Sequence, residues 1–167
     1  MPEFEPDKYQ EAVLRTMSND AQSHPYKWGT LGLFAEAGEL IGLRQKDLFK
    51  PTKQVNAGHY IDELGDVYYY ATALAYYHNM HINELVHAEM LMHSNDIQDW
   101  FYQLSAIAFE IYKDYYVISL TPEARLMLFQ RLFVLIRRMA NHWGMDFDSL
   151  AAANAEKLKD GYNWRQL

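Results

Sequence analysis

The stretch HYIDELGDVYYYATALAYYHN, residues 59–79, decides the expected fold of this chain. Its periodicity predicts one long helix from His59 to about Asn79. Glu63 and Asp66 are three residues apart and therefore share a face of that helix. The neighbours that helical spacing places on this face are all apolar or aromatic: Val67, Tyr70 and Leu74. Two acids thus stand in a stripe that ought to belong to the core.

A second stretch, FAEAGEL at residues 34–40, repeats the pattern inside a helix expected from Thr30 to about Lys46. Glu36 and Glu39 share a face, and the segment 31–43 carries no other charge. The apolar neighbours on this face are Leu33, Leu40 and Leu43. Gly38 and Gly65 each precede an acid, and a helical glycine costs roughly 1 kcal/mol relative to alanine. Close approach of another helix, or of a ligand, would offset that cost.

The remaining chain also has helical periodicity, so the expected fold class is all-α. Segment 19–28, which contains His24-Pro25, and segment 50–58 are expected to be connectors. VISL at 117–120 is an isolated strand-like run, too short to indicate a sheet. Thr121 followed by proline predicts a helix start, and Gly144 predicts a helix end. The other expected helices are 4–17, 82–93, one that follows an N-cap at Ser94 or Asn95 and ends at Tyr115, 122–142 and 146–159.

Composition limits the function classes. The chain has 167 residues, enough for one domain spanning 1–167, and its formal net charge of −7 argues against a nucleic-acid-binding surface. The absence of cysteine excludes disulfides, thiolate zinc sites and cysteine nucleophiles. No apolar run reaches 18 residues, and the polar N-terminal segment is unlike a signal peptide. We therefore expect a soluble cytoplasmic protein with no membrane partner.

The two acidic pairs point to a metal site. If both faces turn inward and meet, four carboxylates share one low-dielectric place and cannot all ionise unaided. Carboxylate oxygens without cysteine suit Mg²⁺, with Mn²⁺ as a possible substitute, and such ions commonly carry substrate phosphates. A pair of ions there would polarise a phosphoryl group and generate the attacking hydroxide. The alternative interpretation is that the acids lie on ordinary solvated helix surfaces.

At these residues the sequence resembles the MazG-like, all-α nucleoside triphosphate pyrophosphohydrolases, a superfamily that includes dimeric dUTPases. Its pattern of E-x-x-E, a spacer, and E-x-x-D corresponds here to 36–39, 40–62 and 63–66. YQEAVLRT at 9–16 resembles the leading helix of the family, and NAEKL at 154–158 resembles its closing helix. The likeness covers roughly residues 7–85 and 139–162. It implies a four-helix-bundle core and Mg²⁺-dependent cleavage between the α and β phosphates, which releases a nucleoside monophosphate and pyrophosphate.

The resemblance also assigns roles by position. Glu36, Glu39, Glu63 and Asp66 would be the metal ligands, and Glu36 would also orient the attacking water. The candidate phosphate contacts are Lys46, Asn154 and Lys157; Lys46 is equally consistent with an ordinary solvated lysine that ends a helix. Where the family often has an arginine before a tyrosine, this chain has Gly161 before Tyr162, with Arg165 nearby.

Aromatic residues suggest further substrate contacts and partners. Trp28, at the entrance to the first acidic helix, is a candidate platform for the nucleobase, and Trp164 is a weaker one. The tyrosines of 68–77 are expected mainly in the core or a subunit interface. A nucleoside triphosphate is the expected partner, in a homodimer or homotetramer as is common in the family. Base and sugar stay open, dUTP and other dNTPs included.

Three other observations leave alternatives open. Residues 74–88 and 139–153 share four identities, which suggests either a degenerate internal duplication or two helix pairs with similar turns. Glu84 and His87 form one E-x-x-H element, whereas a ferritin-like di-iron site needs two, plus a glutamate from each of two other helices. A non-catalytic helical interaction protein is the third alternative.

Overall fold

The computed structural model describes residues 5–91 and 94–159, and in these ranges the chain is helical without a strand. The helices are α1 (Pro6–Thr16), α2 (Asn19–Ser23), α3 (Pro25–Phe49), α4 (Ala57–Tyr77), α5 (Ile82–Val86), α6 (Ile97–Tyr116), α7 (Pro122–His142) and α8 (Phe147–Lys159), with a 3₁₀ turn, η1 (Pro51–Lys53). The all-α expectation is therefore confirmed. Among the described helices, none is long and apolar enough to cross a membrane.

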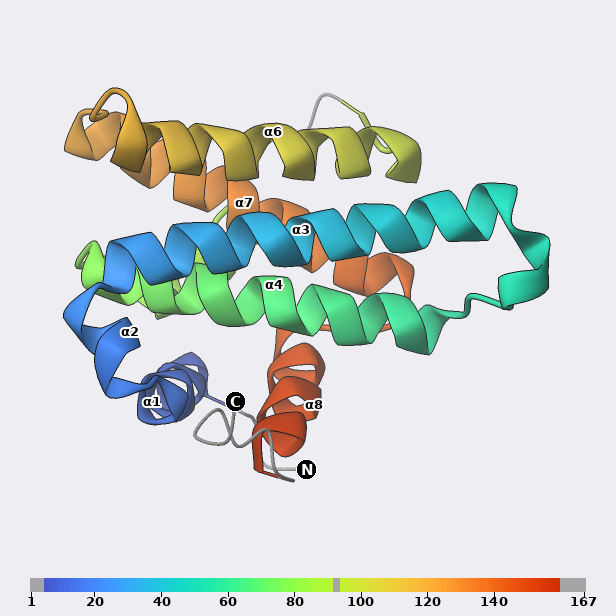
Figure 1. Ribbon diagram of the computed structural model, residues 1–167, viewed down its shortest axis with the longest axis horizontal. Helices are drawn as coiled ribbons and strands as arrows, with labels where there is room; N and C mark the ends of the chain where they lie inside the picture. Colours follow the sequence, from blue (N-terminus) through green and yellow to red (C-terminus); the bar gives the residue numbers. More distant parts are fainter. Residues whose placement is uncertain (1–4, 92–93, 160–167) are drawn as a thin grey trace.

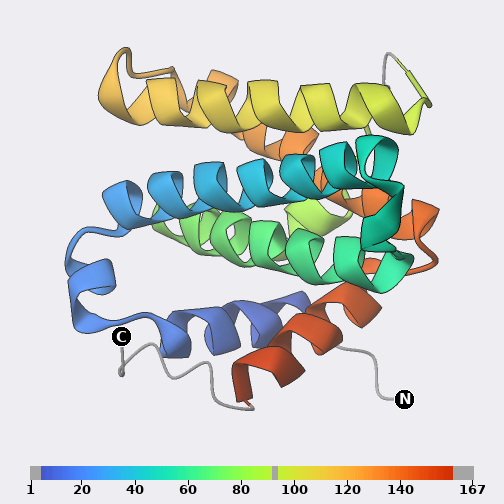
Figure 2. The same cartoon turned by 45° about the vertical axis from the view of Figure 1, so that its right-hand side comes forward.

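Four long helices form the body of the molecule (Figure 1). α3 and α4 run antiparallel, α6 and α7 form a second antiparallel pair, and the contacts close a ring in the order α3, α4, α7, α6. α1 and α8 pack against each other and against α4 on the side away from α6, as the turned view shows (Figure 2). Three layers result, with α4 in the middle one.

α4 is buried on nearly every side because it contacts α1, α3, α5, α7 and α8. Its three consecutive tyrosines contact residues of α1 and α3. Tyr68 stacks on Tyr9 of α1, Tyr69 bonds to the hydroxyl of Thr16, and Tyr70 packs on Trp28 of α3. All three tyrosines are buried, so the expectation of a core role is confirmed for them, whereas Tyr76 is exposed.

The segment 19–28 is not the loop that the sequence predicts. Ser18 caps α2, since its hydroxyl accepts from the Ala21 N–H, and Pro25 stands at the first position of α3. A proline at that position lacks an N–H that the helix does not need and already has a helical φ angle, so His24-Pro25 starts a helix. α3 then continues to Phe49 and ends at Lys50, which precedes Pro51.

One expected helix is shorter than the sequence predicts, and a distant side chain binds the backbone where it ends. The helix expected over 82–93 stops at Val86, and the guanidinium of Arg137 donates to the carbonyls of Val86 and Ala88 at 3.1 and 2.8 Å. The strand-like run 117–120 is a loop, which Asp114 fastens by accepting from the Leu120 N–H at 2.6 Å. Long-range hydrogen bonds therefore accompany the early end of α5, whereas the loop at 117–120 agrees with the expectation that this run forms no sheet.

The predicted helix caps are largely confirmed. Thr121 accepts from the Ala124 N–H and Pro122 opens α7, while Asp146 accepts from the Ser149 N–H at the start of α8. α6 begins one residue later than expected, because Asp96 accepts from the Gln98 N–H at 2.9 Å and is therefore the cap.

The two similar segments of the sequence form the same turn. After α4, Asn79 has φ 57° and the Met80 N–H bonds to the Ala75 carbonyl at 2.9 Å. After α7, Gly144 has φ 82° and the Met145 N–H bonds to the Ala140 carbonyl, also at 2.9 Å. This is the Schellman arrangement of a helix end, which requires a left-handed residue at that point. A shared turn is enough to explain the matching residues, and a duplication stays a prediction.

His78 lies at the end of the bundle, between the rings of Tyr26 and Phe129. Burial, and after it the guanidinium of Arg125, lowers the pKa of His78 to about 4, whereas Asp114 has the opposite effect. Arg125 is itself paired with Asp114, to which it donates two hydrogen bonds of 2.5 and 3.0 Å. The neutral imidazole is thus part of the packing.

We expect Gly144→Ala to lower the free energy of unfolding by about 1–2 kcal/mol, because an L side chain is strained at positive φ. Gly42→Ala is the matched control: an added Cβ meets nothing within 4 Å there, and φ is helical. It should raise stability by about 0.5–1 kcal/mol. Urea denaturation of both variants checks the opposite signs. Equal effects would contradict the turn geometry.

His78 should also make stability depend on pH. Its folded pKa of about 4 lies below the unfolded value of 6.5, so between these values only the unfolded chain takes up the proton. Stability from this group is therefore lost as the pH falls from 6.5 towards 4. His78→Gln should flatten that part of the urea-denaturation profile relative to wild type, whereas His81→Gln, at an exposed position, should leave it unchanged. Identical profiles for His78→Gln and wild type would refute a neutral, packed imidazole.

Candidate metal centre

Three of the four predicted carboxylates converge on one point. Glu36 and Glu39 lie on α3, Glu63 lies on α4, and one oxygen of each carboxylate lies within 4.8 Å of the other two. The antiparallel packing of α3 on α4 brings the two acidic stretches to the same level of the bundle (Figure 1). Glu39 is exposed and the other two are half-buried, so the cluster is open to solvent on one side.

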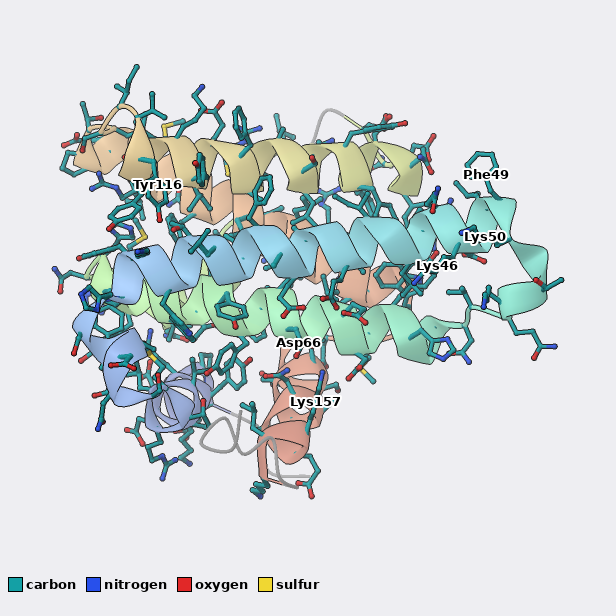
Figure 3. All side chains as sticks on the ribbon, in the orientation of Figure 1. Lys46, Phe49, Lys50, Asp66, Tyr116 and Lys157 are labelled. Atoms are coloured by element: carbon teal, nitrogen blue, oxygen red, sulfur yellow. The ribbon has the colours of Figure 1, made fainter. Side chains whose placement is uncertain are left out.

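The fourth acid, Asp66, is held by α8. The Lys157 ammonium donates to Asp66 Oδ2 at 2.6 Å, and the amide of Asn154 donates to Oδ1 at 3.2 Å. Figure 3 shows Lys157 rising from α8 towards Asp66 on α4. The same ammonium lies 3.2 Å from Oδ1 of Asp62. Both oxygens of Asp66 are therefore engaged by α8, and Asp66 is outside the group of three.

The acids raise one another's pKa values. Burial, followed by the charges of Asp66, Glu39 and Glu63, raises the pKa of Glu36 to about 7, while Lys157 acts in the opposite sense. The pKa of Glu63 is raised by burial first and then by Glu39 and Asp66. Burial also raises the pKa of Asp66, and this effect outweighs the hydrogen bond from Lys157. Placing a cation among these groups would favour their ionised forms.

The donor set fits a hard divalent cation. Three carboxylates supply only oxygen, the ligand that Mg²⁺ and Mn²⁺ prefer, and no histidine stands in the group. A Mg²⁺ ion held by few carboxylates keeps positions for water and substrate phosphates. Glu39 is the exposed member of the group, so a bound ion would face solvent on that side.

Sequence reasoning missed two residues of this region, Tyr9 and Asp62. The hydroxyl of Tyr9 donates to Asn154 Oδ1 at 2.8 Å, and Asp62 shares Lys157 with Asp66. Asp62 was detectable in the sequence because it is four residues from Asp66 and so lies on the same face of α4. Tyr9 lies in the segment that resembles the family's leading helix, but nothing local connects it with Asn154, 145 positions away.

Gly65 and Gly38 differ in what surrounds them. A Cβ added to Gly65 would lie 3.1 Å from the amide nitrogen of Asn154, so this glycine allows α8 to approach α4 closely. A Cβ added to Gly38 meets nothing within 4 Å. The expected close approach of helices is therefore found at Gly65 and not at Gly38.

Two candidate substrate contacts lie away from the cluster. Lys46 is exposed, ten residues beyond Glu36 on α3, which corresponds to about 15 Å along the helix (Figure 3). Trp28 is half-buried and packs on Tyr69 and Tyr70 at 5.9 and 4.8 Å between ring centroids. Residues Gly161, Tyr162, Trp164 and Arg165 lie outside the described part of the chain.

The E-x-x-H element does not find partners. Glu84 lies on the short helix α5 and His87 follows it, where the ring Nδ1 bonds to the Asn83 carbonyl at 2.7 Å. Within residues 5–91 and 94–159, one group of three potential ligand residues lies close enough together to share an ion. This is the acidic cluster on α3 and α4. The structure therefore gives no support to a di-iron site at Glu84 and His87.

Lys157 should stabilise the metal-free protein. Lys157→Gln leaves Asp66 and Asp62 without their ammonium, so we expect the free energy of unfolding to fall by about 1–2 kcal/mol, less than for a fully buried pair. Lys159→Gln is the control, since Lys159 is exposed and pairs with exposed Glu156; its effect should be under about 0.5 kcal/mol. Saturating Mg²⁺ should stabilise Lys157→Gln more than wild type in urea denaturation. Equal stability of the two lysine variants would contradict the stabilising role of Lys157. No response of either protein to Mg²⁺ would contradict a metal site beside it.

Comparison of the chain with family models, with curated proteins and with solved structures gives no match. These three comparisons therefore assign neither a family nor an activity to the chain. The functional assignment depends on the residues and their geometry.

Proposed function

We propose that this protein is a Mg²⁺-dependent nucleoside triphosphate pyrophosphohydrolase that cleaves between the α and β phosphates. The observation that carries the proposal is the convergence of Glu36, Glu39 and Glu63 from two helices on a place where one cation can reach all three. These are the residues at which the sequence resembles the MazG-like family. An acidic protein with such a site can bind a polyphosphate only through a cation, because its own carboxylates repel the substrate.

The arrangement of helices supports the same family. The segments that carry the resemblance, 7–85 and 139–162, contribute α1, α3, α4 and α8 over their described parts, and these helices pack around α4. We assign them to the expected four-helix core, with α6 and part of α7 as the additional helices. The two acidic pairs lie on α3 and α4, the antiparallel helices that pack against each other.

Glu36, Glu39 and Glu63 would hold Mg²⁺, and Asp66 would join them from the next turn of α4. Bound Mg²⁺ would neutralise phosphate charge and polarise the phosphoryl group. Glu36 would accept a hydrogen bond from the attacking water and orient it, which is the role that the resemblance gives it. Lys157 is the ammonium closest to the cluster, so it is the first candidate to contact a phosphate.

The other predicted substrate contacts, Asn154, Lys46 and Trp28, fit this scheme less directly. Asn154 is buried, and both polar atoms of its amide have partners within the protein. We therefore assign Asn154 to the support of Asp66 in place of a phosphate contact. Lys46 and Trp28 keep their predicted roles only for a substrate that extends along α3 in one direction or the other.

A homo-oligomer stays a prediction, and one surface is suited to it. Phe34 of α3 and Phe109 of α6 are each 48% exposed, and the ring of Tyr112 lies between them at 6.1 and 6.3 Å. Tyr116 continues this row towards the end of α6 (Figure 3). Aromatic residues in such a row are enriched at protein interfaces.

The decisive experiment measures pyrophosphate release from a panel of dNTPs and NTPs with Mg²⁺, including dUTP. Wild type should act on at least one of them. Glu63→Gln removes a ligand charge and should reduce kcat/KM by about 100-fold or more, which corresponds to several kcal/mol of transition-state stabilisation. Glu123→Gln, an exposed acid in the first turn of α7, is the control and should keep the wild-type rate.

Two results would contradict the proposal. One is a folded wild type that releases no pyrophosphate from any nucleotide of the panel, which would favour the non-catalytic helical protein. The other is a Glu63→Gln variant with the wild-type rate, which would separate the activity from the acidic cluster.

A further inference from the structure

The buried side of the metal centre is a chain of hydrogen bonds that crosses three helices. It starts at the Tyr9 hydroxyl on α1, passes through the Asn154 amide on α8 and ends at Oδ1 of Asp66 on α4. The two bonds measure 2.8 and 3.2 Å. Tyr9 and Asn154 are 0% and 3% exposed, so water does not replace either partner.

The chemistry of the end groups determines the direction of every bond in this chain. An ionised carboxylate only accepts hydrogen bonds, so Asn154 must present its NH₂ group to Asp66. The carbonyl oxygen of the same amide then faces Tyr9 and needs a donor. Tyr9 supplies it, and its hydroxyl keeps the proton because burial and the nearby negative groups raise its pKa well above the usual value. A rotated amide would place an oxygen against the carboxylate.

Packing keeps both supporting side chains in place. The Tyr9 ring stacks on Tyr68 with 4.8 Å between centroids and an angle of 13°. Asn154 lies against the backbone of α4, where Gly65 leaves space for it. Side chains fixed in this way can fix the orientation of the carboxylate that they support.

We infer that Tyr9 is a positioning residue of the metal centre: through Asn154 it fixes the orientation of the Asp66 carboxylate, which stands beside the group of Glu36, Glu39 and Glu63, and thereby the position from which Asp66 would reach a bound cation. The inference rests on the proposed function, because it assumes that the cluster binds a divalent cation. It extends that function by including a residue of α1 that touches neither the cation nor the substrate.

The test is the affinity for Mn²⁺, measured from the signal of the free ion by electron paramagnetic resonance during titration of the protein. Tyr9→Phe keeps the ring and removes only the hydroxyl, and it should weaken Mn²⁺ binding about tenfold, as expected for loss of an outer partner of a metal ligand. Tyr68→Phe is the matched control, since Tyr68 is equally buried and stacks on the same ring. It should leave the Mn²⁺ affinity within about twofold of wild type.

A double-mutant cycle tests whether Tyr9 acts through Asn154. Asn154→Ala breaks the same chain of bonds, so Tyr9→Phe should weaken Mn²⁺ binding no further in the Asn154→Ala background. Circular dichroism at the titration temperature confirms that each variant is folded. Asn154→Ala also provides the test by itself should Tyr9→Phe not fold, and its expected loss is again about tenfold.

Each outcome is decisive. Mn²⁺ affinity that is unchanged in Tyr9→Phe, equally reduced in Tyr68→Phe, or lost additively in the double variant would overturn the inference while wild type still binds Mn²⁺ and releases pyrophosphate. If wild type itself binds no Mn²⁺, both the inference and the proposed function fall. If wild type binds Mn²⁺ and Tyr9→Phe weakens it, but no nucleotide is cleaved, only the hydrolase activity is refuted.

Discussion

The burial of α4 on nearly all sides is the constraint on which the rest of the structure depends. A helix in contact with five others can present a charged side chain only at the gaps between its neighbours. Glu63 lies at the gap beside α3, where Glu36 and Glu39 stand, and Asp66 lies at the gap beside α8. The acidic site is therefore part of the packing of the central helix, and its position follows from which helices enclose α4.

The helical spacing of the acids predicted the site only in part, and the reason is geometric. Residues three apart on an α-helix differ by about 60° around its axis, so they share a face broadly but point to different neighbours. Glu63 faces α3 and Asp66 faces Lys157 and Asn154 because of this divergence. The helical periodicity of the sequence was sufficient to predict the all-α fold and to identify the four acids as candidates. It could not show which partner each acid meets, since Lys157 is 91 positions from Asp66.

The wrong end of the helix expected over 82–93 has a physical origin that no local pattern contains. Periodicity and propensity describe what a segment favours in isolation, whereas side chains from distant helices decide where the backbone hydrogen bonds go. The guanidinium of Arg137 on α7 donates to the carbonyls of Val86 and Ala88, 51 and 49 positions away. Caps within four residues of a helix end, such as Thr121 and Asp146, were predictable because both partners lie in the same short stretch.

The electrostatics of the cluster argue for a ligand more strongly than the residue types do. The Lys157 ammonium pairs with Asp66 and Asp62, beside the cluster of Glu36, Glu39 and Glu63. Burial first, and then the charges of Asp66, Glu39 and Glu63, raises the pKa of Glu36 to about 7, although Lys157 acts in the opposite sense. A scaffold would gain stability by replacing such a glutamate with an uncharged residue. Carboxylates kept close together against this repulsion are typical of a site where a cation supplies the missing charge.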